Sequence, residues 1–362
     1  MTLPDRPELT PVREAHRFDE AALAVYLRGR LPGCDAGLEV LQFEGGQSNP
    51  TYCLRAGDRR YVLRKKPPGK LLPSAHQVER EYRVMTALRD SDVPVPRTRL
   101  LCEDAGVIGT PFYVMDHVEG RVLTDARMPR LSRAERAALY ADFVRVLAAL
   151  HGLDPAAIGL ADFGRPGNYY ARQIARWSQQ YLASRTEEIP SMQALMEWLP
   201  AHVPDSDETR VVHGDYRVGN CIVHPTEPRV VAVLDWELST LGHPLGDLAY
   251  FCQGYHGEAV PGESLIGVDL AALGIPSEAE VVERYCKLTG RPGIEHWSFY
   301  LVFVMFRSAA IVQGVYKRGL DGNAASERAR EYGALVRRRA DQAWELAQGG
   351  RSPQRAVQGG SA

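Results

Sequence analysis

The sequence has little cysteine, and its cysteines and histidines are not spaced as metal ligands. Six cysteines are scattered through 362 residues, at positions 34, 53, 102, 221, 252 and 286, and no C-x-x-C pair occurs. Scattered thiols of this kind predict reduced cysteines in a cytosolic protein. The ten histidines show no metal-ligand spacing either.

Net charge and long apolar runs are also scarce. The net charge of −2 gives no indication of a nucleic-acid groove or of binding to an anionic membrane. The N-terminus has no apolar signal core, and the longest apolar run, Phe299 to Phe306, is too short to span a bilayer. We therefore expect a cytoplasmic protein with no nucleic-acid or membrane partner, and a buried helix around Phe299.

The most informative stretch runs from Val211 to Asp247. Its short apolar runs predict strands at Val211-Val212, Cys221 to Val223 and Val230 to Leu234. Polar side chains lie at the ends of these strands or on the tight loop between them. They are Asp215, Asn220 and Asp235.

These three side chains suit phosphoryl transfer. That reaction needs a carboxylate to take the acceptor's hydroxyl proton and oxygen ligands for Mg²⁺ on the phosphates. Asp215 fits the first role as the catalytic residue, and Asn220 and Asp235 fit the second as metal ligands. A turn with a capping aspartate and a solvated asparagine would explain any one of these residues, but not the whole pattern.

The spacing H-x-D-x-x-x-x-N, from His213 to Asn220, is followed by an apolar strand and Asp235. It resembles the catalytic and metal-binding loops of the protein-kinase-like fold. Gly214 in place of Arg, and Asp-Trp-Glu in place of Asp-Phe-Gly, make it more similar to the aminoglycoside phosphotransferase and choline kinase family. Members of that family phosphorylate hydroxyl groups of small molecules, and the resemblance extends from about Leu38 to Leu346.

The resemblance implies ATP and Mg²⁺ as cofactors and an α+β, two-lobed protein-kinase-like fold. The implied nucleotide-binding lobe, 1–116, is an antiparallel sheet with one main helix. The implied catalytic and acceptor-binding lobe, 117–348, is mostly helical, and the composition of 349–362 predicts a disordered tail.

A glycine-containing turn, Gly45-Gly46-Gln47-Ser48, separates two predicted strands near the start of the chain. Such a turn lets backbone N–H groups approach phosphates closely, although most Gly-Gly turns are only turns. The family's nucleotide-covering loop lies here, so the resemblance assigns Gly45, Gly46 and Ser48 to the nucleotide.

The next predicted strand ends in the cations Arg64 and Lys65. Neighbouring side chains of a strand point to opposite faces, so only one can contact the α- and β-phosphates. The resemblance favours Arg64 in place of the usual lysine, with Lys65 as the alternative. Glu81 lies within the apolar stripe of the following helix and needs a partner there. We expect an ion pair with one of these cations; the alternative is a Glu81 that faces water.

Phe112 to Gly120 resembles the connector between the lobes. The resemblance implies that the adenine edge binds the Asp116 carbonyl and the Val118 N–H, with Met115 at the mouth of the pocket. An edge strand followed by a turn is the alternative. The resemblance also implies that Asp247 binds backbone N–H groups of the catalytic loop.

Four further residues have open interpretations. Glu237 either reaches the metal or caps its loop. Arg307 interrupts an apolar helix face, which favours a structural ion pair over contact with an anionic substrate. Arg172 and Arg176 share a helix face and either meet an anionic acceptor or lie in solvent, paired with nearby acids.

Within the family, Gly45 to Tyr52, Val62 to Gly69 and Leu234 to Glu237 look most similar to the kinase-like domains joined to acyl-CoA dehydrogenases. That similarity implies a hydroxyacyl-CoA or related metabolite as the small-molecule hydroxyl acceptor, and a functional link to an acyl-CoA dehydrogenase. The alternatives are an aminoglycoside-type antibiotic phosphotransferase, which needs an acidic cleft, and a nucleotide-binding pseudokinase.

Overall fold

The computed structural model describes residues 8–44, 49–67, 77–257, 262–321 and 332–350. The chain divides into two compact units. The first comprises Met1–Leu123, Ile158–Leu160 and Gly219–Ser239, and the second comprises Thr124–Ala157, Ala161–Val218 and Thr240–Ala362. The first unit therefore extends past residue 116 and takes in the segment that carries Asn220 and Asp235.

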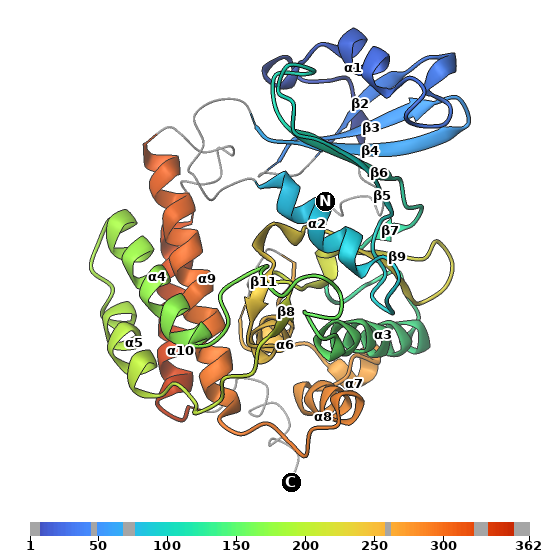
Figure 1. The fold of residues 1–362 in the computed structure, drawn as a ribbon. Coiled ribbons are helices and arrows are strands. Elements are labelled where there is room, and N and C mark those ends of the chain that lie inside the picture. The colour runs from blue at the N-terminus through green and yellow to red at the C-terminus, as the bar shows by residue number, and fades with distance from the viewer. Residues whose placement is uncertain (1–7, 45–48, 68–76, 258–261, 322–331, 351–362) are drawn as a thin grey trace. The chain divides into compact units, whose positions relative to one another are not determined.

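The first unit contains a six-stranded antiparallel sheet in the order β1-β2-β3-β4-β6-β5 (Figure 1). A two-residue loop joins β3 to β4, and its Gly57 has the positive φ of +62° that such hairpin turns require. The sequence predicted β2 and β3, on either side of the Gly45-Gly46 turn, and β4, which ends in Arg64 and Lys65. The bounds are β1 Leu9–Thr10, β2 Glu39–Phe43, β3 Thr51–Ala56, β4 Arg59–Lys65, β5 Thr98–Cys102 and β6 Phe112–Asp116.

Helices cover both faces of this sheet (Figure 1). Helix α1 (Glu20–Leu27) begins at Asp19, whose side chain accepts the Ala22 N–H at 2.8 Å, and packs Leu23 and Leu27 into the core of one face. Helix α2 (Val78–Leu88) packs on β5 and β6 with an apolar stripe that includes Glu81. The sequence ahead of α2, Ser74-Ala75-His76-Gln77, predicts a capping box, but its first three residues lie outside the described residues.

The segment Gly219–Ser239 forms a hairpin of β9 (Cys221–Val223) and β10 (Val230–Val233). Strand β7 (Arg121–Val122) pairs with β9, and the Val233 N–H donates to the Pro94 carbonyl at 2.8 Å. A Cβ on Gly120 would lie 2.4 Å from the Val223 carbonyl, so only glycine allows this close approach. These contacts attach the hairpin to the first unit.

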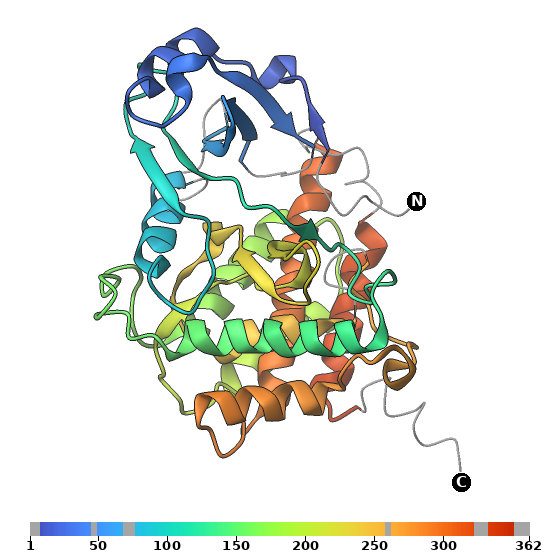
Figure 2. The same ribbon diagram turned by 90° about the vertical axis from the view of Figure 1, so that its right-hand side faces the viewer.

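The second unit is mostly helical, with one short antiparallel pair of β8 (Arg210–Val212) and β11 (Thr240–Gly242). Capping boxes at Ser132 and Ser277 begin two of its helices. Figures 1 and 2 show α9 beside α10 and α3 beside α8. The bounds are α3 Arg133–Gly152, α4 Tyr169–Ser184, α5 Pro190–Ala201, α6 Leu245–Cys252, α7 Leu270–Leu273, α8 Glu278–Thr289, α9 Trp297–Leu320 and α10 Gly333–Ala347.

Helix α9 is the central helix of this unit. By length and composition alone it could cross a membrane, but 78% of its most apolar stretch is buried inside the protein. It packs against α4, α6 and α10. A core helix of a folded domain accounts for this burial, as expected from the apolar run at Phe299.

A cluster of aromatic rings surrounds Tyr170, and the 2% exposed His243 belongs to it, stacked 5.5 Å from the ring centroid of Tyr300. Burial lowers the pKa of His243 to about 4, so the ring is neutral at pH 7. Its Nε2 lies 3.0 Å from the Ser206 hydroxyl.

This burial predicts a pH-dependent stability. Because the pKa of His243 is lower in the folded chain than the usual ~6.5, the unfolded chain binds more protons between these values. Stability is full above pH ~6.5 and falls as the pH drops towards 4, by up to about 3 kcal/mol. Urea unfolding at pH 7.5 and at pH 5 measures this change. The free energy of unfolding should fall less between the two pH values for His243→Gln than for the wild type. Equal losses would contradict this assignment.

Candidate active site

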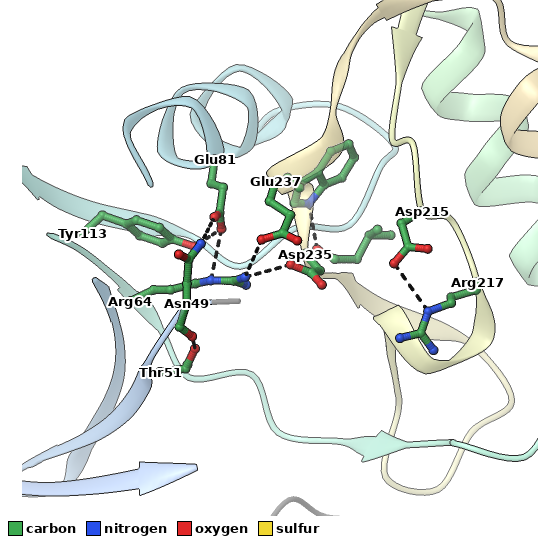
Figure 3. Close-up of polar contacts among 11 residues, drawn as sticks. Asn49, Thr51, Arg64, Glu81, Tyr113, Asp215, Arg217, Asp235 and Glu237 are labelled. Carbon is green, nitrogen blue, oxygen red and sulfur yellow. Dashed lines mark hydrogen bonds and ion pairs between the residues drawn. The ribbon is translucent and has the colours of Figure 1, made fainter. Parts of the chain in front are cut away.

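Arg64 is the centre of a buried ion-pair cluster in the first unit (Figure 3). Its Nε lies 3.3 Å from Glu81 Oε2, and its Nη2 lies 2.7 Å from Asp235 Oδ1. The Glu237 carboxylate is 3.8 Å from the same Nη2. The expected strand-to-helix ion pair is therefore present, and Arg64 forms it.

Two uncharged side chains complete the surroundings of Glu81, which is 1% exposed. Asn49 Nδ2 donates to Oε1 at 2.8 Å, and the Tyr113 hydroxyl donates to Oε2 at 3.0 Å. Although burial lowers the pKa of Arg64, Glu81 and Asp235 outweigh it and hold that pKa above its usual value. The cluster therefore keeps a fixed cation on the surface of β4.

Lys65 lies on the other face of β4. It is 3% exposed, its Nζ is 5.5 Å from the ring centroid of Phe18, and burial lowers its pKa. The two cations diverge as strand alternation requires. Only Arg64 shares a face with Glu81 and Asp235.

Asp235 follows β10 directly and has an unusual backbone conformation. Its φ of +65° is left-handed, a conformation that is uncommon for residues other than glycine and that aspartate tolerates better than most. The next residue, Trp236, is buried and donates its ring N–H to the Val233 carbonyl at 3.0 Å. About a third of the Asp235 side chain remains exposed, so the carboxylate is accessible.

Asn220 lies beside the start of the Asp235 turn. Its backbone carbonyl accepts the Leu234 N–H at 2.8 Å, which joins the beginning of β9 to the end of β10. The first unit thus brings Asn220 and Asp235 to the same end of one hairpin, together with Arg64 and Glu81. Asp215 lies in the second unit, five residues before Asn220 in the sequence.

The backbone ahead of Asp215 is fixed by Asp247 at the start of α6. One carboxylate oxygen accepts the His213 N–H at 2.6 Å, and the other accepts the Gly214 N–H at 2.8 Å. Although burial raises the pKa of Asp247, His151 beside it and these hydrogen bonds hold that pKa below its usual value. The support that the resemblance implied for Asp247 is present, and Gly214 has the left-handed φ of +85° that this turn needs.

The Asp215 side chain has neighbours that the sequence did not reveal. Arg217 Nε lies 3.5 Å from Asp215 Oδ2 (Figure 3). The Nη1 of Arg217 lies 2.9 Å from Glu263 Oε1. The Tyr250 hydroxyl is hydrogen bonded to Asp215, and burial and this carboxylate raise the pKa of Tyr250 well above its usual value. Arg217 lies within the motif from His213 to Asn220. Nothing in the sequence indicated that Tyr250 or Glu263 would lie near Asp215.

The nucleotide-binding roles of the connector residues and of the glycine turn remain predictions. Met115 and Asp116 end β6, and Val118 follows in the connector. The Asp116 side chain accepts two hydrogen bonds from Arg99, at 2.7 and 2.6 Å. Gly45, Gly46 and Ser48 lie outside the described residues.

Comparison with known proteins identifies the family of this chain. The family model described as "Phosphotransferase enzyme family" matches residues 39–285. The chain belongs to this phosphotransferase family.

Its relatives include longer proteins. It is 46% identical over 347 residues to acyl-CoA dehydrogenase family member 10 of Mus musculus, covering 94% of this chain and 32% of the relative. It is 45% identical over 326 residues to family member 11 of Homo sapiens, covering 88% of this chain and 42% of the relative. The chain thus spans about a third to less than half of the length of these relatives.

Solved structures establish the fold. A Ralstonia eutropha JMP134 protein described as a candidate aminoglycoside phosphotransferase superposes with a TM-score of 0.84 at 50% identity, covering 92% of this chain and 100% of that one. The aminoglycoside phosphotransferase APH(4)-Ia, solved with ADP and hygromycin B, gives a TM-score of 0.59 at 17% identity, covering 89% of this chain and 97% of that one, and so shows the fold alone. The predicted α+β protein-kinase-like fold and the family resemblance are confirmed.

Proposed function

We propose that this protein is an ATP-dependent kinase that transfers the γ-phosphoryl group of ATP to a hydroxyl group of a small molecule. The observation that carries the proposal is Arg64, which joins Glu81 to Asp235. One buried cluster thereby couples a cation suited to phosphates with a carboxylate suited to a metal ion. The family membership supports phosphoryl transfer as the reaction.

The residues near Asp235 suit Mg²⁺. The ion prefers oxygen ligands and is usually held by one or two protein side chains together with substrate phosphates. Asp235 and the Asn220 amide would hold it, and Glu237 offers a further carboxylate beside Arg64. Within the described ranges no group of three or more His, Cys, Asp or Glu residues could hold a metal by itself, which fits such a sparse set. When bound, the ion neutralises charge on the phosphates.

Asp215 would accept the proton of the acceptor hydroxyl as that oxygen bonds to the γ-phosphorus, while the bond from this phosphorus to the β–γ bridging oxygen breaks and ADP leaves. The Asp247 contacts to His213 and Gly214 hold the loop, and Tyr250 orients the carboxylate. In this mechanism the chain positions the reactants and stabilises charge, and it forms no covalent intermediate.

The two neighbouring cations provide a matched test of nucleotide binding. Arg64→Met should raise the KM for ATP by roughly 10- to 100-fold, because a charged hydrogen-bond donor to the phosphates is lost. Lys65→Met should leave this KM unchanged, since Lys65 faces Phe18. Initial rates of ADP release at varied ATP concentration give the KM of each variant. A larger rise in KM for Lys65→Met than for Arg64→Met would mean that Lys65 contacts the phosphates.

For the acceptor we propose a hydroxyacyl-CoA or a related hydroxylated metabolite, supported by the relatives named as acyl-CoA dehydrogenase family members. A polycationic aminoglycoside would need free carboxylates. Two acids of the second unit that could supply such carboxylates are already engaged: Asp207 accepts the Asn168 N–H at 2.8 Å, and Glu208 pairs with Arg210 and Arg291. The functional link to an acyl-CoA dehydrogenase is part of the proposal.

ADP release measured with hydroxyacyl-CoA and with kanamycin or hygromycin B, under the same Mg-ATP conditions, tests this acceptor class. Faster turnover with an aminoglycoside would overturn the acceptor and favour an antibiotic phosphotransferase. No ADP release above background with any hydroxylated acceptor would favour a nucleotide-binding pseudokinase.

A further inference from the structure

Arg307 is a buried cation beside the catalytic loop. It lies on the otherwise apolar central part of α9 and is 7% exposed. Its Nη2 donates to the Gly214 carbonyl, and its guanidinium carbon lies 5.6 Å from the ring centroids of both Trp177 and Tyr250. Its Nε is buried and has no hydrogen-bond partner.

Across the described part of the chain, no carboxylate forms an ion pair with Arg307. The two nearest along the loop serve other groups: Asp247 accepts the His213 and Gly214 N–H groups, and Asp215 contacts Arg217 and Tyr250. The structural ion pair that the sequence favoured is therefore absent from these residues. A buried charge without a counter-charge is costly, and an anionic ligand would supply the missing charge at Arg307.

Arg172 shows what a purely structural arginine looks like in the same unit. Its guanidinium donates to the backbone carbonyls of Arg165, Pro166 and Gly167, which close the loop before α4. Arg176, which was expected to share a helix face with Arg172, is exposed to solvent. Neither arginine is as deeply buried as Arg307, and neither lies beside the catalytic loop.

We propose that Arg307 binds an anionic oxygen of the acceptor, so that the substrate is a hydroxylated anion whose hydroxyl group meets Asp215. The inference rests on the proposed kinase function. Tyr250 contacts both Arg307 and Asp215: its ring lies beside the Arg307 guanidinium group, and its hydroxyl group is hydrogen bonded to Asp215. The guanidinium group is suited to carboxylate and phosphate oxygens, and the flanking rings exclude water and so strengthen that contact.

The oxyanion has two possible sources, the carboxylate of a free hydroxy acid and a phosphate of a CoA ester. Steady-state ADP release should therefore be compared for 3-hydroxybutyrate, 3-hydroxybutyryl-CoA and the uncharged 3-hydroxybutyryl-pantetheine. Arg307→Gln keeps a donor for the Gly214 carbonyl but removes the charge. It should raise the KM for the acceptor that carries the recognised anion by roughly 10- to 100-fold, change kcat much less, and leave the KM for the pantetheine ester unchanged.

Arg307→Lys restores a charge and should recover part of the affinity. Arg318→Gln is the matched control, because it removes an exposed cation from the same helix, and it should change no KM. Thermal melts of all the variants report whether the fold is kept. An equal rise in KM for the charged and uncharged acceptors would overturn the inference, because Arg307 would then act only by holding the loop.

Measuring anion binding directly, without nucleotide, tests the anion site independently of the proposed kinase activity. Calorimetry without nucleotide should show binding of 3-hydroxybutyrate or of CoA to the wild type and at least tenfold weaker binding to Arg307→Gln. That result, together with no ADP release, would keep the anion site and reject the kinase. Equal binding to both proteins, or no binding of either anion to the wild type, would reject the anion site whatever the kinase assay gives.

Discussion

Asp215→Asn is expected to lower kcat by roughly 10²- to 10⁴-fold, the usual contribution of a general base. The amide has nearly the shape of the carboxylate but cannot take the acceptor's proton. It can still accept the hydrogen bond from Tyr250, and the loop remains held by Asp247 and Arg307. The Kd for ATP and the melting temperature should therefore change little.

Asp247→Asn is the informative comparison for this variant. The buried Asp247 carboxylate satisfies two backbone N–H groups and lies 3.3 Å from His151 Nε2, so neutralising it should destabilise the fold as well as the reaction. Single-turnover rates and melts on both variants separate chemistry from loop support. If Asp215→Asn turned over within a few-fold of wild type, Asp215 would not be the base.

The sequence was sufficient for features that depend on neighbouring positions. The caps at Asp19, Ser132 and Ser277 are of this kind, because each side chain binds a backbone N–H only three residues further along the chain. Strand alternation required Arg64 and Lys65 to diverge, and the apolar stripe of α2 required a partner for Glu81. The choice of Arg64 as that partner needed the tertiary structure, because it depends on which face of β4 α2 covers.

Contacts between distant segments could not be predicted in this way. Arg307 and Gly214 are separated by 93 residues, and periodicity identified only that a charge interrupts an apolar helix. It could not show that the partner would be a backbone carbonyl. Tyr250 and Glu263 were missed for the same reason, since neither residue belongs to a recognisable motif. The hairpin Gly219–Ser239 likewise joins the first unit through contacts with segments far away in the sequence.

Asp235→Asn is expected to weaken binding of Mg-ATP on the order of 100-fold, while metal-free ATP should bind within a few-fold of wild type. Losing a charged ligand of this kind costs about 3 kcal/mol. Asparagine is the suitable replacement, because at φ +65° it tolerates the left-handed backbone that alanine would strain. Metal-free ATP should be spared, since Arg64 keeps its pairing with Glu81 and is partly released for the phosphates.

Calorimetric titration with ATP in Mg²⁺ and in EDTA measures both affinities for the Asp235 variant. Glu237→Gln is the control: its carboxylate lies 3.8 Å from Arg64, against 2.7 Å for Asp235, and it should reduce Mg-ATP affinity much less. Equal weakening with and without Mg²⁺ would mean that Asp235 acts through Arg64 and the backbone turn instead of the ion. A larger effect of Glu237→Gln would transfer the main metal-binding role to Glu237, two residues further along the same turn.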